Sequence, residues 1–111
     1  MVVGIAQRIE ELLAEPSSGE AAPTLARMES TLTDGYAEAL ALEAERSRIE
    51  RRIGEVASTA DDRVGLAEEL TALASRRHSA DRELTTLRSL LGRLQSRARA
   101  KRRQTIPDRT A

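Results

Sequence analysis

Two runs of mainly apolar residues, spaced by alternating steps of three and four, occupy the sequence between Leu25 and Ala98. Such steps average 3.5 residues, which is the repeat of α-helices that supercoil around a partner helix. The first run is Leu25, Met28, Leu32, Gly35, Ala39, Leu42, Arg46, Ile49, Ile53 and Val56, and the second is Leu66, Leu70, Leu73, Arg77, Ala80, Leu84, Leu87, Leu91, Leu94 and Ala98. We therefore expect two long helices that each present one apolar stripe.

The two runs pair in a single antiparallel register. Pairing Val56 with Leu66 and continuing outwards gives ten layers, in which each step down one run is a step up the other. Small residues then lie opposite large ones, as Gly35 does opposite Leu87, so that the side chains interdigitate. The alternatives are chance heptads in helices rich in Leu and Ala, or parallel pairing between chains. Ten layers in one register favour a long antiparallel two-helix coiled-coil hairpin within one chain, an all-α fold.

Turn and capping residues divide the chain into four segments. An N-terminal amphipathic helix, a linker, the hairpin with a turn near 58–61, and a flexible tail are predicted to span residues 1–15, 16–22, 23–103 and 104–111, respectively. Pro23 suits the first position of the first long helix, where its missing N–H costs nothing. Thr59 can cap the second long helix, and Asp61 and Asp62 suit its positive N-terminal end. Two aspartates at a hairpin turn can also hold a metal ion, but helix capping is their more common role.

The N-terminal helix has a clear apolar face, made of Val2, Ile5, Ala6, Ile9, Leu12 and Leu13. An isolated helix of this length is marginal in water, so it needs a surface to pack against. The open end of the hairpin offers apolar residues beside the paired runs, namely Tyr36, Ala37, Leu40, Ala41 and Leu90. We expect the short helix to dock there as a partial three-helix bundle. Another chain or a membrane surface could bind it instead, although its acidic polar face disfavours the membrane.

One layer of the predicted hairpin places Arg46 opposite Arg77. Two like charges in an apolar stripe repel each other and resist desolvation. Acids on the same helices can relieve them, because Glu43 and Glu50 flank Arg46 and Asp81 follows Arg77 by one turn. The layer either fixes the register of the two helices or forms a docking site for an acidic partner.

Charge is unevenly distributed although the formal net charge is zero. Residues 1–45 hold nine acidic residues against two arginines, whereas residues 93–111 hold seven basic residues against one aspartate. The basic helix end consists of Arg93, Arg97, Arg99, Lys101, Arg102 and Arg103. Such clusters attract phosphates, which makes nucleic acid a candidate partner. Folding also lays this end beside the acidic start of the first arm, and the absence of interleaved aromatic residues removes base stacking.

The sequence contains no pattern that indicates catalysis. His78 is the only histidine and there is no cysteine, so no familiar metal-ligand spacing can be assembled. No glycine-rich phosphate loop or nucleophile motif is present. We therefore expect no catalytic residues, no cofactor and no metal, and an interaction protein in place of an enzyme.

The start of the sequence and the length of its apolar runs indicate where in the cell the protein is expected. Residues 1–13 lack a basic region followed by a long apolar core, and no apolar run approaches the ~20 residues that span a bilayer. We expect a cytoplasmic coiled-coil protein that binds another protein or a second copy of itself as a homodimer. The alternative is a nucleic-acid-binding or transcription-associated factor that uses the basic helix end. The sequence identifies neither the partner nor the oligomeric state.

Overall fold

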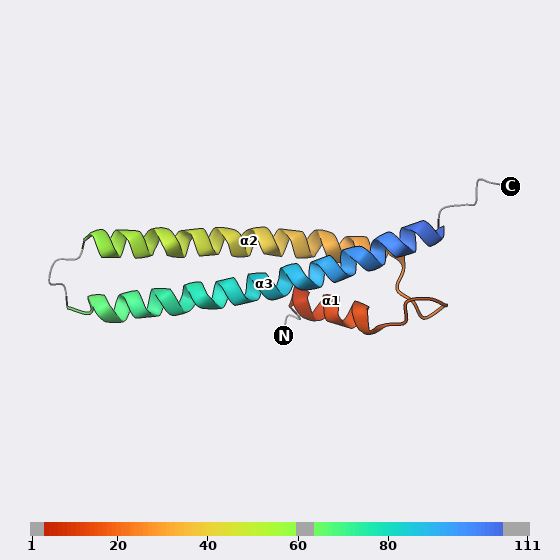
Figure 1. Cartoon of the computed structure of the whole chain (residues 1–111), viewed down its shortest axis with the longest axis horizontal. Coiled ribbons are helices and arrows are strands. Elements are labelled where there is room, and N and C mark those ends of the chain that lie inside the picture. Colours follow the sequence, from red (N-terminus) through yellow and green to blue (C-terminus); the bar gives the residue numbers. More distant parts are fainter. Residues whose placement is uncertain (1–3, 60–63, 106–111) are drawn as a thin grey trace. The chain divides into compact units, whose positions relative to one another are not determined.

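The computed structural model describes residues 4–59 and 64–105. Within these residues it contains three α-helices and no strand: α1 (Ile5–Ala14), α2 (Leu25–Ser58) and α3 (Leu66–Thr105). The two long helices α2 and α3 pack against each other as an antiparallel hairpin, and α1 packs at their end (Figure 1). The predicted all-α hairpin with an additional short helix is therefore confirmed.

The helices build two compact units. One comprises Met1–Glu38 and Thr86–Ala111 and contains α1, and we call it the three-helix unit. The other, Ala39–Thr85, contains only segments of α2 and α3, and we call it the two-helix unit. Each unit has its own buried core.

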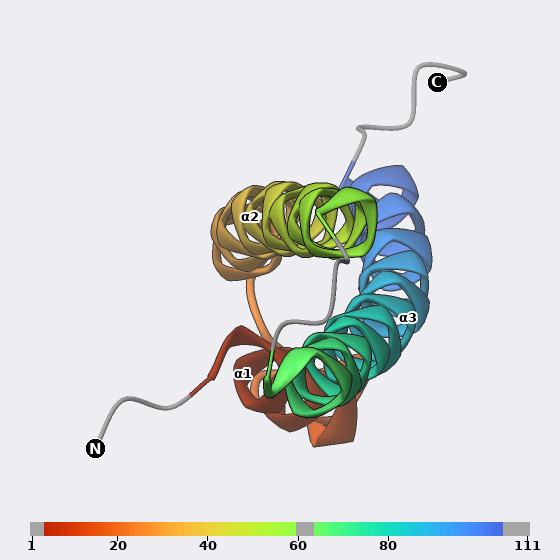
Figure 2. The same ribbon diagram turned by 90° about the vertical axis from the view of Figure 1, so that its left-hand side faces the viewer.

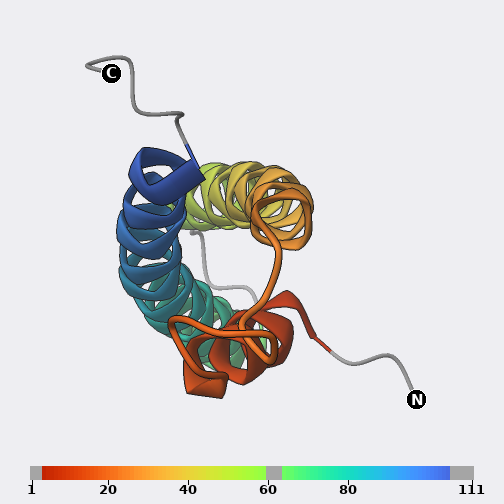
Figure 3. The same ribbon diagram turned by 90° about the vertical axis from the view of Figure 1, so that its right-hand side faces the viewer.

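The core of the three-helix unit receives side chains from all three helices. Figure 3 shows α1, the first turns of α2 and the last turns of α3 arranged around a common interior. Ile9 of α1 is completely buried, and Leu12 is nearly so. The other buried apolar residues of this unit are Met28, Leu32, Leu87, Leu90, Leu91, Leu94 and Ala98. The apolar face of α1 is thus docked within this chain, as the sequence predicted.

Gly35 determines how closely α1 and α3 approach α2. A Cβ atom at this position would stand 2.5 Å from Cδ2 of Leu91 and 3.5 Å from Cδ1 of Ile9. The space beside Gly35 is therefore filled by Leu91 and Ile9, whereas the sequence pairing assigned it to Leu87. A larger residue here would separate α2 from both neighbouring helices.

The two-helix unit packs through a single seam. Ile49, Val56 and Leu73 form its buried cluster, against which Ile53, Leu66 and Leu70 pack while remaining partly exposed. Figure 2 faces this unit from the turn, with the green ends of α2 and α3 nearest the viewer. Because each helix here has only one partner, a large part of its surface stays in water.

The start of α2 differs from the prediction by two residues. The hydroxyl oxygen of Thr24 accepts a hydrogen bond from the backbone N–H of Arg27 over 3.1 Å, so Thr24 is the N-cap. The helix begins at Leu25, and Pro23 is buried just before the cap. The assignment of Pro23 to the first helical position was therefore wrong, because the hydroxyl of Thr24 caps a helix that begins at Leu25, two residues after Pro23.

The residues before and after the turn also correct the sequence interpretation. The Thr59 hydroxyl donates to the carbonyl oxygens of Glu55 and Val56, over 3.0 and 3.2 Å, so Thr59 ends α2 and does not cap α3. α3 begins only at Leu66, after Gly65, whose φ of +87° suits a residue without a Cβ atom. The predicted capping aspartates Asp61 and Asp62 lie outside the described residues.

Candidate interaction sites

The outward face of α2 carries a second row of residues spaced by steps of four and three. Within the two-helix unit this row is Leu40, Ala44, Ser47, Arg51, Gly54 and Ser58, and every member is exposed. We call it the outer row. Its spacing is that of a coiled-coil contact, and its small side chains would let the backbone of another helix approach closely. Leu40 is its only large apolar residue, and 66% of its surface is exposed.

The exposure of Leu40 corrects one expectation about the docking of α1. The sequence predicted that α1 would cover Tyr36, Leu40 and Leu90. Leu90 is buried, but Tyr36 is 43% exposed and Leu40 more so. Helical geometry explains this exposure. α1 contacts α2 on the side of Gly35, and Tyr36 and Leu40, which follow Gly35 by one and five residues, point away from that side.

The predicted arginine layer of the two-helix unit contains two ion pairs that link α2 to α3. Arg46 Nη1 lies 3.2 Å from Asp81 Oδ1, and Arg77 Nε lies 3.4 Å from Glu50 Oε1. Each arginine thus pairs with an acid of the facing helix, whereas the sequence expected acids of the same helix. Both side chains are about one third to one half exposed. Long arginine stems can cover the seam while their charged ends reach water and their partners.

A neighbouring carboxylate in the two-helix unit binds two arginines. Glu45 accepts hydrogen bonds from Arg48 over 2.8 Å and from Arg76 of α3 over 3.0 Å. These bonds, with the one from Arg48 the larger effect, hold the pKa of the Glu45 carboxyl below its usual range. The carboxylate therefore acts as a bridge between two helices, and it is poorly suited to accept a proton in catalysis near neutral pH.

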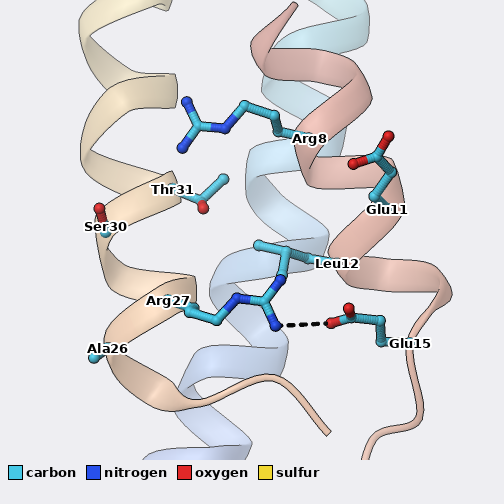
Figure 4. Close-up of a pocket in the computed structure, with 8 residues that line it drawn as sticks. All are labelled: Arg8, Glu11, Leu12, Glu15, Ala26, Arg27, Ser30 and Thr31. Carbon is cyan, nitrogen blue, oxygen red and sulfur yellow. Dashed lines mark hydrogen bonds and ion pairs between the residues drawn. The ribbon is translucent and has the colours of Figure 1, made fainter. Parts of the chain in front are cut away.

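A groove of about 460 Å³ lies between α1 and α2 in the three-helix unit (Figure 4). Arg27 Nη1 lies 3.5 Å from Glu15 Oε2 across it, and Arg8, also at its border, pairs with Asp34 over 3.2 Å. Leu12 and Thr31 project into it from opposite helices. Both guanidinium groups already have carboxylate partners, so neither is available to balance the charge of an anionic ligand.

The basic helix end separates into residues with partners and residues without. Arg102 pairs with Glu29 over 3.2 Å, so the basic end does meet the acidic start of α2. Arg93, Arg99 and Arg103 are exposed, and within residues 4–59 and 64–105 their side chains have no hydrogen-bond or ion-pair partner.

Arg97 has a structural role that the sequence did not reveal. Its Nη1 atom donates to the carbonyl oxygens of Leu12 and Leu13, and its Nη2 atom donates to the carbonyl oxygen of Glu15 over 3.0 Å. These carbonyls belong to the C-terminal end of α1, where backbone acceptors lack helical partners. A guanidinium from α3 therefore caps α1. Main-chain carbonyls occur at every position, so no sequence pattern could indicate this contact.

A second hollow, of about 290 Å³, lies between the linker and α3. Ser17 and Ser18 line it from the linker, and Arg97, Lys101 and Gln104 line it from α3. Lys101 is half-buried. We call this the linker hollow, and it holds the only lysine of the chain.

Side chains that could bind a metal ion do not gather in the described part of the chain. Over residues 4–59 and 64–105 no group of three or more His, Asp or Glu side chains is arranged to hold a metal ion. His78 is exposed on α3. No helix in these two ranges combines the length and apolar composition needed to cross a membrane.

Comparison with protein-family models, with curated proteins and with solved structures finds no match to this chain.

Proposed function

We propose that the chain is a small coiled-coil protein that binds a helix of another protein through the outer row of α2. The observation that carries this proposal is the exposure of Leu40 at the start of a heptad-spaced row. Burying one leucine side chain contributes roughly 1.5–3 kcal/mol, which a partner helix can supply. Small residues at the next two positions, Ala44 and Ser47, leave room for large side chains of that partner.

The charge around the outer row indicates the chemistry of the partner. Around Leu40, between residues 38 and 45, α2 carries three acidic residues and no basic residue, whereas residues 46–58 carry four arginines and two glutamates. A partner helix with basic residues beside its apolar stripe would complement the surface around Leu40. The partner helix belongs to a different protein or to a second copy of this chain, whose α3 carries basic residues near its C-terminal end. We place the interaction in the cytoplasm, with which the lack of cysteine is compatible.

Site-specific photo-crosslinking in the source cells tests this proposal. A photoreactive amino acid at position 40 should crosslink to one discrete protein, and the same residue at position 82, an exposed site on α3, is the control. Ala44→Glu should abolish the crosslink from position 40 while leaving helicity intact, because Glu is a good helix former. Equal crosslinking from positions 40 and 82, or none from either, would contradict a binding surface on α2.

Nucleic acid is the second candidate partner, supported by the exposed charges of Arg93, Arg99 and Arg103. Binding through them would weaken steeply as salt rises, because counterions are released from the phosphates. Anisotropy of labelled duplex and single-stranded oligonucleotides, measured at several salt concentrations, separates the two candidates. Tight binding that Arg93→Gln with Arg99→Gln abolishes, and that Ala44→Glu leaves unchanged, would favour the nucleic-acid function.

A further inference from the structure

All polar groups that line the linker hollow on its two facing sides are able to donate hydrogen bonds. The linker contributes the hydroxyls of Ser17 and Ser18, and α3 contributes the ammonium of Lys101 and the amide of Gln104. The guanidinium of Arg97 completes the wall. No carboxylate lines the hollow. A concave site with convergent donors is suited to a ligand that carries several acceptor oxygens.

The two positive charges in the hollow lack a carboxylate partner within the described residues. Arg97 donates to main-chain carbonyls, which hold its position without cancelling its full charge. Lys101 follows Arg97 by four residues on α3, and over residues 4–59 and 64–105 its ammonium has no hydrogen-bond or ion-pair partner. Like charges four residues apart destabilise a helix. The nearby carboxylates are engaged elsewhere, since Glu15 pairs with Arg27 and Glu29 with Arg102.

The rest of the hollow is apolar. Pro23 and Met28, both buried, and Ala100 form this part of its wall. The volume of about 290 Å³ exceeds what one inorganic anion needs and lies at the lower end of the range for small-molecule pockets. The shape therefore favours an anion with a small apolar group over a bare ion.

We propose that the linker hollow binds a small organic phosphate monoester. Its phosphoryl oxygens would accept hydrogen bonds from Lys101, from the linker hydroxyls and from the free N–H groups of Arg97, and its organic group would pack against Met28. Lysine and arginine are the usual partners of phosphate, because a charged donor strengthens each hydrogen bond. The site lies in the three-helix unit and is independent of the outer row that carries the proposed function.

The single lysine makes this proposal testable at one residue. The rate at which acetic anhydride acetylates Lys101 is measured by mass spectrometry on the intact full chain followed by digestion. Phenyl phosphate is the probe, and benzyl alcohol and inorganic phosphate are the matched controls. At a phenyl phosphate concentration of about ten times its Kd, acetylation should slow about tenfold, because mass action leaves about a tenth of the sites free.

Two sets of variants separate the hollow from general anion screening. Ser17→Ala with Ser18→Ala should weaken the protection of Lys101, and both positions are exposed in the linker, so folding should persist. Arg93→Gln with Arg99→Gln should leave the protection unchanged, because these side chains do not line the hollow. Circular dichroism checks that every variant is folded.

The outcomes that would overturn the proposal are specific. An unchanged acetylation rate with phenyl phosphate would exclude the site. Equal protection by inorganic phosphate would exclude the organic half of the ligand. Protection by a short oligonucleotide but not by phenyl phosphate would assign the charges to nucleic acid. None of these results depends on the crosslinking from position 40, so the two proposals succeed or fail separately.

Discussion

Arg97 Nη1 donates a hydrogen bond to the carbonyl oxygen of Leu13 over 2.6 Å, which joins residues 84 positions apart. The same guanidinium also reaches the carbonyl oxygen of Glu15. A positive charge at the C-terminal end of α1 satisfies backbone acceptors and interacts favourably with the helix dipole. Together with the buried side chain of Ile9, this contact fixes α1 in the three-helix unit.

Arg97→Met should therefore destabilise the protein and loosen α1. Loss of hydrogen bonds from a charged donor to half-buried carbonyls is expected to cost about 2 kcal/mol of unfolding free energy, measured in urea. Hydrogen exchange over Ile5–Ala14 should accelerate more than exchange elsewhere. Arg99→Met is the control, since Arg99 is exposed and lacks a partner in the described residues. If Arg97→Met and Arg99→Met lower the free energy of unfolding by the same small amount, Arg97 does not cap α1.

Two glycines within α2 should respond in opposite directions to the same substitution. Gly35→Ala places a methyl group 2.5 Å from the buried Leu91 side chain, so it should lower the free energy of unfolding by about 1–2 kcal/mol despite better helix propensity. At Gly54 an added methyl group would have no atom within 4 Å, so Gly54→Ala should raise the free energy of unfolding by about 1 kcal/mol. Thermal melts of the two variants decide the point. A gain in stability from both would show that the packing around Gly35 is loose.

The arginine layer should be replaceable by apolar residues. Arg46→Leu with Arg77→Leu is expected to raise stability by about 1 kcal/mol, because half-exposed ion pairs contribute little and the seam becomes continuous. Arg51→Leu with Arg82→Leu, on exposed positions outside both apolar runs, should bring no gain. Sedimentation of the Arg46→Leu, Arg77→Leu variant measures its oligomeric state. A changed oligomeric state would show that the two arginines help to specify the pairing of α2 with α3. A clear loss of stability would mean that the pairs with Asp81 and Glu50 are net stabilising.

Most residues of the stripe that the sequence predicts are buried in the structure. Val56, Leu84 and Leu94 are buried as the alternating spacing requires, because helical periodicity alone decides which residues share a face. The ends of the helices were less predictable, because the sequence analysis chose Pro23 as the start of α2 and Thr59 as the cap of α3, whereas Thr24 caps α2 and Thr59 binds carbonyls at the end of α2.

The outer row and the linker hollow were the features least predictable from the sequence. Periodicity identifies the apolar face of α1 but not which side of α2 it contacts, and in the structure Ile9 lies beside Gly35. Leu40 was consequently expected to be covered, and its exposure emerges only from the structure. The linker hollow requires Ser17 and Lys101 to meet across more than eighty residues of sequence, and no local pattern encodes that meeting.

The cap that Arg97 places on α1 has a consequence for biosynthesis. α1 precedes α3 in the chain, so it is synthesised before the guanidinium of Arg97 that satisfies its C-terminal end. Until Arg97 has been synthesised, the carbonyl groups at the C-terminal end of α1 lack this guanidinium partner, and the three-helix unit is incomplete. This interval is the period in which a chaperone could bind α1, and slower translation through α3 would lengthen it.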